Sequence, residues 1–380
     1  MKFSGKTLSY VEARRTIFGL SQRKGLAIMS DSLTSDKNKP ILGKKGESLY
    51  RDAIFNQSMF GEKTPKTVVM VMAGIHGAEA APGFLMLCEL IEEMEKRFPP
   101  EIGFVLVTPN PYGFSYNQRG GEDGADVNRS CSFPNSPTPN LHYDDLKYLV
   151  EPKMLNWDII RKIQEKVSDF PGGKGWAEIQ QKVICGQYHS PQGLFYGTGG
   201  GKLCRSGEFV KYLCENFLSA AYGVENLFAL DLHMGLGKKS SGTILSPETS
   251  KDSAMAVLIK KWFGDDGVNF PNAKDNNVSG AVQGDILSAI TRWLPMVKVV
   301  PVALEMGTTS PLVSFPAKVG KMWLKNHPDK VYLVDSKLVE KIQEDYRLTF
   351  APIEDGVWME ALRSRFFQIL DSAVKGLLEM

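Results

Sequence analysis

Two imidazoles and one carboxylate stand directly after apolar stretches of this sequence. His76 and Glu79 follow residues 67–75, and His233 follows residues 226–232. A histidine and a glutamate three residues apart on a turn can face one point, and a second histidine from a neighbouring strand completes a set of two nitrogens and one oxygen. Three protein ligands with an open fourth position form a typical catalytic zinc site. A lone H-x-x-E is more often a hydrogen-bonded histidine at a strand end, so the prediction of a metal site depends on the second histidine.

A further carboxylate occupies a comparable position. Glu305 follows residues 297–304, a run too apolar to be exposed, and stands in the sequence LEMGT. A surface or salt-bridged glutamate is the alternative interpretation of this residue. The buried strand that precedes Glu305 favours a role in catalysis.

Four apolar runs predict the strands that must position these residues. Runs of this kind, rich in valine and bounded by turn residues, are typical of strands buried on both faces. The predicted strands cover residues 67–75, 102–108, 226–232 and 297–304. Helical spacing of apolar residues predicts helices at 10–20, 84–94, 155–168, 206–219, 252–263, 281–293 and 358–373.

This alternation predicts an α/β fold, a single large domain with a mixed, mostly parallel central sheet and helices on both faces. Ligands of such sheets bind beyond the carboxyl ends of the strands, which is where the histidines and glutamates stand. Residues 1–66 are mixed and polar, so we expect them to form a leading subregion packed on the main domain, which covers residues 67–380.

Composition excludes several classes of protein. The 380 residues are 43% hydrophobic and 23% charged, which is typical of globular proteins rather than disordered or collagenous ones. A formal net charge of +2 without a basic run makes nucleic acid an unexpected partner. We expect no membrane association and a cytoplasmic location, because neither a signal-like leader nor eighteen consecutive apolar residues are present. Five cysteines without a C-x-x-C pair argue against a disulfide framework.

Four motifs give the sequence a family resemblance. The stretches GIHGAEAAPG, NPYGFSYNQRGGEDGADVNRS, ALDLHMGLG and ALEMGT occur in this order. Together they resemble the zinc carboxypeptidase (M14-like) superfamily, and in particular its branch of bacterial DUF2817-type proteins. The resemblance runs from about Gly46 to about Thr308 and implies a zinc carboxypeptidase-like, phosphorylase/hydrolase-like fold.

The resemblance implies roles for the residues described above. His76, Glu79 and His233 would hold one Zn²⁺ ion, whose charge lowers the pKa of a bound water from 15.7 toward roughly 7 and polarises the scissile carbonyl. Glu305 would take the proton from that water and later deliver it to the leaving amine.

The resemblance also implies residues that act around the metal. Asp126, Asn128 and Arg129 match the family's D-x-N-R pattern, in which Asn128 and Arg129 would hold the free carboxylate of the substrate. Asp126 would accept a hydrogen bond from the ring of His76. Arg119 matches a family arginine that helps to stabilise the oxyanion, although the family often has two adjacent arginines where this chain has Gln118 and Arg119.

The expected function is therefore that of a zinc metallocarboxypeptidase, a hydrolase that cleaves a carboxyl-terminal peptide or peptide-like amide bond. An aspartoacylase-like amidohydrolase of small N-acyl amino acids is an open alternative, because its substrates also carry a carboxylate near the amide. A peptide-binding relative without catalysis is a second alternative, against which the retention of all three ligands and Glu305 argues. The expected partner is a peptide or an N-acyl amino acid.

Overall fold

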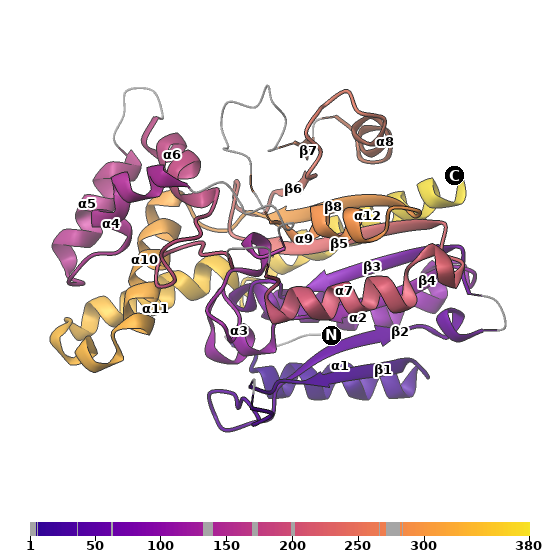
Figure 1. Cartoon of the computed structure of the whole chain (residues 1–380), viewed down its shortest axis with the longest axis horizontal. Helices are drawn as coiled ribbons and strands as arrows, with labels where there is room; N and C mark the ends of the chain where they lie inside the picture. The colour runs from indigo at the N-terminus through magenta and orange to yellow at the C-terminus, as the bar shows by residue number, and fades with distance from the viewer. Residues whose placement is uncertain are drawn as a thin grey trace.

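A mixed β-sheet forms the centre of the protein (Figure 1). The computed structural model describes residues 5–380 except 6, 36, 62–63, 132–139, 169–173, 199–201, 266, 271–281 and 283. Within these residues the sheet has eight strands in the order β1-β2-β4-β3-β5-β8-β6-β7. The strands are β1 (Ala27–Ser32), β2 (Tyr50–Phe55), β3 (Thr67–Ala73), β4 (Gly103–Thr108), β5 (Asn226–Met234), β6 (Gly242–Leu245), β7 (Val268–Asn269) and β8 (Lys298–Met306).

The four central strands are parallel. β4 pairs with β3, β3 with β5, and β5 with β8, whereas β2 and β6 join the outer sides of this group in antiparallel orientation. Parallel strands place their carboxyl ends at one edge of the sheet, so the residues that follow β3, β5 and β8 gather there. β1 and β2, which fall within residues 1–66, form one edge of this same sheet.

Helices bury both faces of the sheet. Alternate residues of β3 point to opposite sides, with Val69 and Val71 in one apolar cluster and Val68 and Met70 in another. The first face is covered by α1 (Tyr10–Arg23), α2 (Ala80–Arg97), α8 (Ala254–Phe263) and α12 (Gly356–Leu378). The second face is covered by α7 (Arg205–Phe217) and α9 (Ile286–Trp293).

A further group of helices lies beyond the carboxyl edge of the sheet, at the left of Figure 1. Its members are α4 (Lys147–Val150), α5 (Trp157–Ser168), α6 (Lys174–Ile179), α10 (Pro311–Asn326) and α11 (Ser336–Phe350). α10 packs against both α5 and α11. The short helix α3 (Pro111–Tyr116) follows β4 at the same edge.

The predicted fold class is confirmed: the chain is an α/β domain with a mixed, mostly parallel sheet. Each of the four predicted strands and each of the seven predicted helical segments has a counterpart, although positions 281 and 283 of the last internal helix lie outside the described residues. Strands β1, β2, β6 and β7 and helices α3, α4, α6, α10 and α11 were not predicted.

Among the described residues, the structure contains no helix that is both long enough and apolar enough to cross a membrane.

Trp358 connects the closing helix to the carboxyl end of β8. Its side chain is fully buried, and its Nε1–H donates a hydrogen bond of 2.7 Å to the carbonyl oxygen of Gly307. We expect Trp358→Ala to lower the free energy of unfolding by about 3–5 kcal/mol, because it opens a large cavity and removes this hydrogen bond. Chemical denaturation followed by circular dichroism measures the change.

Val357 provides the matched control on the same helix. It is 78% exposed, so Val357→Ala should change the free energy of unfolding by no more than about 0.5 kcal/mol. Equal effects of the two substitutions would contradict the assignment of Trp358 to the core.

Candidate metal centre

The turn after β3 carries His76 and Glu79. Gly74 makes the turn possible with a φ of +78°, a left-handed backbone conformation that residues with a side chain rarely adopt. Gly77 lies so close to α3 that a Cβ atom would meet the carbonyl carbon of Gly113 at 1.9 Å. The conformation of this turn is therefore fixed by close backbone packing against α3.

Hydrogen bonds from the following segment hold the same turn. The side-chain amide of Asn110 donates to the carbonyl oxygen of Ile75 at 3.0 Å and accepts a bond from the N–H of Gly113. The N–H of Ala78 donates to the carbonyl oxygen of Gln118 at 2.9 Å. The N-P-Y-G motif thus positions the H-x-x-E turn.

His233 and Glu305 are direct neighbours across two parallel strands. They are register partners in the β5–β8 ladder, so their side chains emerge beside each other at the carboxyl edge. The turn after β5 contains two glycines of positive φ, Gly235 at 123° and Gly237 at 101°. Between them, the N–H of Leu236 donates to Oε1 of Glu305 at 2.9 Å.

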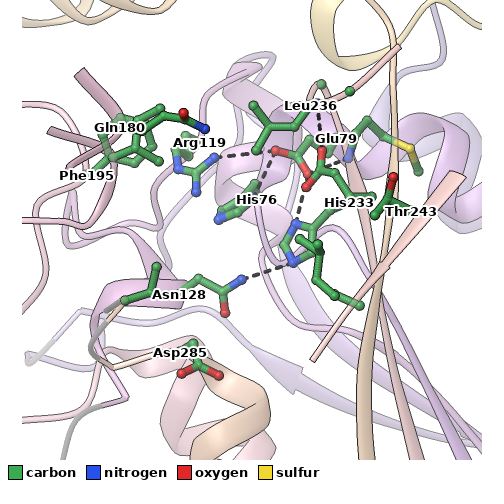
Figure 2. A pocket seen from close by; sticks show the side chains of 18 of the residues that line it. His76, Glu79, Arg119, Asn128, Gln180, Phe195, His233, Leu236, Thr243 and Asp285 are labelled. Atoms are coloured by element: carbon green, nitrogen blue, oxygen red, sulfur yellow. Dashed lines mark hydrogen bonds and ion pairs between the residues drawn. The ribbon is translucent and has the colours of Figure 1, made fainter. Parts of the chain in front are cut away.

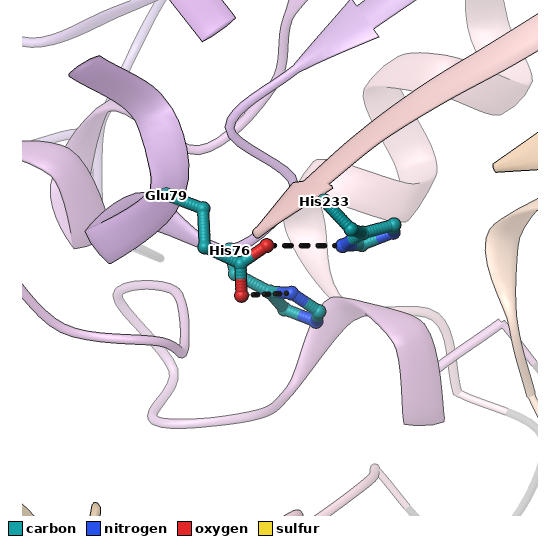
Figure 3. Close-up of side chains that lie close together, drawn as sticks. All are labelled: His76, Glu79 and His233. Atoms are coloured by element: carbon teal, nitrogen blue, oxygen red, sulfur yellow. Dashed lines mark hydrogen bonds and ion pairs between the residues drawn. The ribbon is translucent and has the colours of Figure 1, made fainter. Parts of the chain in front are cut away.

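The structure brings His76, Glu79 and His233 together (Figure 3). Nδ1 of His76 lies 3.0 Å from Oε1 of Glu79, and Nδ1 of His233 lies 3.1 Å from Oε2 of the same carboxylate. One ligand atom from each residue lies within 4.8 Å of the others, and all three side chains are buried. This is the donor set and the spacing that one tetrahedral cation requires.

Each imidazole has a carboxylate behind it. Nε2 of His76 lies 3.2 Å from Oδ1 of Asp126, and Nε2 of His233 lies 2.6 Å from Oδ2 of Asp231. Metal-binding histidines commonly donate their second ring N–H to such a partner, which fixes the tautomer and leaves the other nitrogen free to bind the ion. Both Nδ1 atoms are therefore the nitrogens that face the shared carboxylate.

These contacts shift the acidities of the buried groups. Burial alone would raise the pKa of Glu79, but His76 and His233 hold it below its usual range. Burial alone would lower the pKa of His233, but Asp231 and Glu79 hold it well above its usual value. Burial alone would raise the pKa of Asp126, which Arg119 and His76 instead hold well below its usual value. The centre thus keeps its carboxylates charged at neutral pH.

Glu305 has the opposite character. Burial raises the pKa of its carboxyl group to about 7, although His233 and the N–H of Leu236 oppose the shift. A carboxylate with a pKa near the working pH is suited to accept a proton and to return it.

Arg119, Asn128 and Arg129 line the same cavity, which has a volume of about 560 Å³. Figure 2 shows Arg119 and Asn128 beside Glu79 and His233. Arg119 donates from Nε to Asp126 at 2.6 Å, and its NH1 lies 3.5 Å from Oε1 of Glu79. Nδ2 of Asn128 lies 3.0 Å from Nε2 of His233.

Arg129 is more constrained than the sequence suggests. Its NH1 donates to the carbonyl oxygen of Asn128 at 2.7 Å and its NH2 to that of Ile184 at 2.5 Å. Its buried Nε has no hydrogen-bond partner among the described residues. The guanidinium group is therefore anchored to the cavity wall, with one hydrogen on each terminal nitrogen still available.

Asp231, whose side chain contacts His233, is a residue of the site that the sequence analysis did not identify. The available signal was the spacing D-x-H, because residues two apart on a strand share a face. Lys318 and Phe350 also line the cavity and were not predicted, because α10 and α11 were not predicted.

Fold and site together define an α/β protein with a buried His–Glu–His cluster at the carboxyl edge of its sheet. A family described as "Protein of unknown function (DUF2817)" matches residues 7–365, so the chain belongs to the DUF2817 family. The predicted resemblance to that branch is confirmed. A search of curated proteins gave no match.

Three solved structures are among those to which the chain is similar. Carboxypeptidase A from Helicoverpa armigera is 13% identical, with 90% of this chain and 73% of that chain covered and a TM-score of 0.45. Bovine thrombin-activatable fibrinolysis inhibitor, in complex with tick carboxypeptidase inhibitor, is 10% identical, with 92% and 97% covered and a TM-score of 0.44. A metallo-carboxypeptidase from Burkholderia cenocepacia is 12% identical, with 95% and 70% covered and a TM-score of 0.39.

The packing of Gly77 predicts the effect of a single methyl group. We expect Gly77→Ala to displace the turn that carries His76 and Glu79, and so to weaken the binding of added zinc at this candidate site by at least about tenfold. Calorimetric titration of the metal-free protein with zinc measures this change. Gly356→Ala is the control, since a Cβ there meets nothing within 4 Å. Unchanged zinc affinity in Gly77→Ala would show that the turn is not held as described.

Proposed function

We propose that this protein is a zinc-dependent metallopeptidase of the carboxypeptidase type, which hydrolyses a carboxyl-terminal peptide or peptide-like amide bond. The single observation that carries the proposal is the convergence of two Nδ1 atoms on Glu79, with the carboxyl group of Glu305 on the adjoining strand. Metal ligands alone would suit a structural site as well. The neighbouring carboxyl group with a pKa of about 7 favours catalysis.

The three residues fit a zinc ion by the chemistry of their donors. Two imidazole nitrogens and one carboxylate oxygen leave a fourth position open, and Asp126 and Asp231 orient the two rings. A zinc ion bound there would supply a Lewis acid and lower the pKa of water in the fourth position.

The remaining residues have distinct parts in the proposed reaction. Glu305 accepts a proton from the attacking water and passes it to the leaving amine. Arg119, held in place by Asp126, directs its guanidinium toward the carbonyl oxygen on which negative charge develops. Because its ion pair with Asp126 is already formed, Arg119 requires little reorganisation as that charge develops.

Asn128 and Arg129 bind the carboxylate of the leaving residue in this proposal. The free hydrogens on NH1 and NH2 of Arg129 can donate to the two oxygens of a carboxylate, in the paired geometry that arginine favours. Since both nitrogens already donate to backbone carbonyls, the guanidinium group is oriented before the substrate arrives.

Hydrolysis of small N-acyl amino acids is a second candidate function. A cavity of about 560 Å³ lies in the size range of sites that enclose small ligands. The two functions share the same metal centre and differ only in the length of the acyl part of the substrate. A panel of N-acyl amino acids and blocked dipeptides distinguishes them by relative kcat/KM.

The proton-transfer role of Glu305 gives a direct test. We expect Glu305→Gln to lower kcat by at least about 10²-fold on every hydrolysed substrate of this panel, because an amide cannot accept the proton. Zinc content, measured by atomic emission, should remain at one ion per chain. Full activity in Glu305→Gln would remove this residue from the reaction.

The metal-ligand role of His233 is tested separately from activity. We expect His233→Ala to lose bound zinc while its circular dichroism spectrum stays close to that of the wild type. His142→Ala provides the matched control, because His142 is exposed and lies away from the cavity lining. Stoichiometric zinc in the His233 variant would show that the ligand set is wrong.

A further inference from the structure

The main cavity continues into a small side pocket. This pocket has a volume of about 40 Å³ and shares four wall residues with the main cavity, namely Arg119, Phe195, Lys318 and Phe350. Three lysines of α10, namely Lys318, Lys321 and Lys325, line it. Asn128 and Arg129 line only the main cavity. The side pocket is therefore a separate space that opens beside Arg119.

Lys318 is the unusual member of this lining. The residue is only 7% exposed, yet its ammonium group forms no ion pair or hydrogen bond with the residues that the structure describes. Its Nζ lies 5.2 Å from the centre of the Phe350 ring. A buried cation without a partner is costly to a fold, so Lys318 requires an explanation beyond packing.

The charges around Lys318 place it close to the metal centre. Burial lowers the pKa of Lys318 to about 8, and the nearby charge of Arg119 lowers it further, whereas Glu79 and Glu305 oppose the shift. Both glutamates already have other partners, since Glu79 bridges the two histidines and Glu305 accepts from Leu236. An additional anion in the pocket would complete the environment of the ammonium group.

Lys321 extends the positive surface away from the centre. It follows Lys318 by three residues, and therefore shares its side of the helix. Its Nζ lies 5.6 Å from the centre of the Tyr346 ring, and within the described part of the chain it has no carboxylate partner. Lys325 has a simpler explanation, because a lysine in the last turn of a helix is favoured by the helix dipole. That explanation does not apply to Lys318, in the middle of α10.

Ordinary lysines of this protein behave differently. Lys166 of α5 and Lys182, which follows α6, pair with Glu178 at 2.6 Å and 3.1 Å. A lysine that extends past apolar surface normally places its ammonium group in bulk water. Lys318 does neither, because its head group lies at the junction of two cavities.

We propose that Lys318, assisted by Lys321, binds a carboxylate on the substrate residue that supplies the carbonyl group of the cleaved amide. This inference rests on the proposed function and deepens it: the substrate is an acyl amino acid or peptide with Asp or Glu at that position. The position follows from Arg119, which faces the scissile carbonyl in the proposed reaction and forms a wall of the side pocket. The carboxylate of the leaving residue binds elsewhere, at Asn128 and Arg129.

The size of the side pocket supports a carboxylate as its ligand. A cavity of about 40 Å³ has room for about three water molecules. A carboxylate group is small enough to enter this space in place of that water. Phe195 and Phe350 wall the pocket on its apolar sides, so water is partly excluded and the attraction between ammonium and carboxylate is strengthened.

The kinetic test compares blocked dipeptides that differ only in Glu or Gln before the scissile bond. We expect the zinc-loaded wild type to prefer Glu by at least tenfold in kcat/KM, and Lys318→Met to reduce this ratio to near one. Lys318→Arg should retain part of the preference, because it keeps the charge. The control Lys375→Met, an exposed position outside both cavities, should leave the ratio unchanged.

Equilibrium binding separates this proposal from the proposed function. Calorimetry on the zinc-loaded Glu305→Gln variant should show the Glu dipeptide binding at least fivefold more tightly than the Gln dipeptide, and addition of Lys318→Met should remove the difference. If no amide is hydrolysed but this difference is found, the binding site stands and the proposed reaction fails. Equal affinity for the two dipeptides would contradict the proposed binding site at Lys318. A preference for an acidic side chain only on the leaving residue would contradict it as well.

Discussion

The carboxylate of Glu79 organises the whole site. It lies between two imidazoles that come from different strands, at 3.0 Å and 3.1 Å from their Nδ1 atoms, and it also accepts the N–H of Met234 at 3.0 Å. A buried carboxylate is costly unless its charge is compensated. Here the two imidazoles compensate the charge of Glu79, and the same three side chains could surround a cation. The fold therefore holds these side chains together even without an ion.

On either side of Glu79, carboxylates alternate with groups that can carry a positive charge. Each histidine that faces Glu79 has an aspartate behind it, and Asp126 is in turn paired with Arg119. Such chains of partners keep ring orientation and tautomer fixed. The pKa of Glu305 is raised to about 7 because this carboxyl group, on the adjoining strand, lies outside that compensated chain and is buried.

The sequence predicted those site residues that stand at the carboxyl ends of buried parallel strands. Strong apolar runs marked β3, β4, β5 and β8, and the residues directly after them proved to be the ones that converge. The edge strands could not be found, because β1 is mostly exposed and carries no apolar run. Helix α10 escaped prediction since Pro316 interrupts it and Lys318 is buried where a polar residue suggests solvent. Contacts such as Arg129 with Ile184 join distant segments, so no local pattern encodes them.

The tight turn after β5 has a consequence for how this architecture can vary. Gly235 and Gly237 allow the chain to reverse so sharply that Leu236 reaches back to Glu305 on the next strand. One short peptide thereby ties His233 and Glu305 into a single rigid unit. An insertion or deletion in this turn would separate His233 from Glu305. We therefore expect related proteins to keep the length of this turn and to vary in the loops that lie farther from the site.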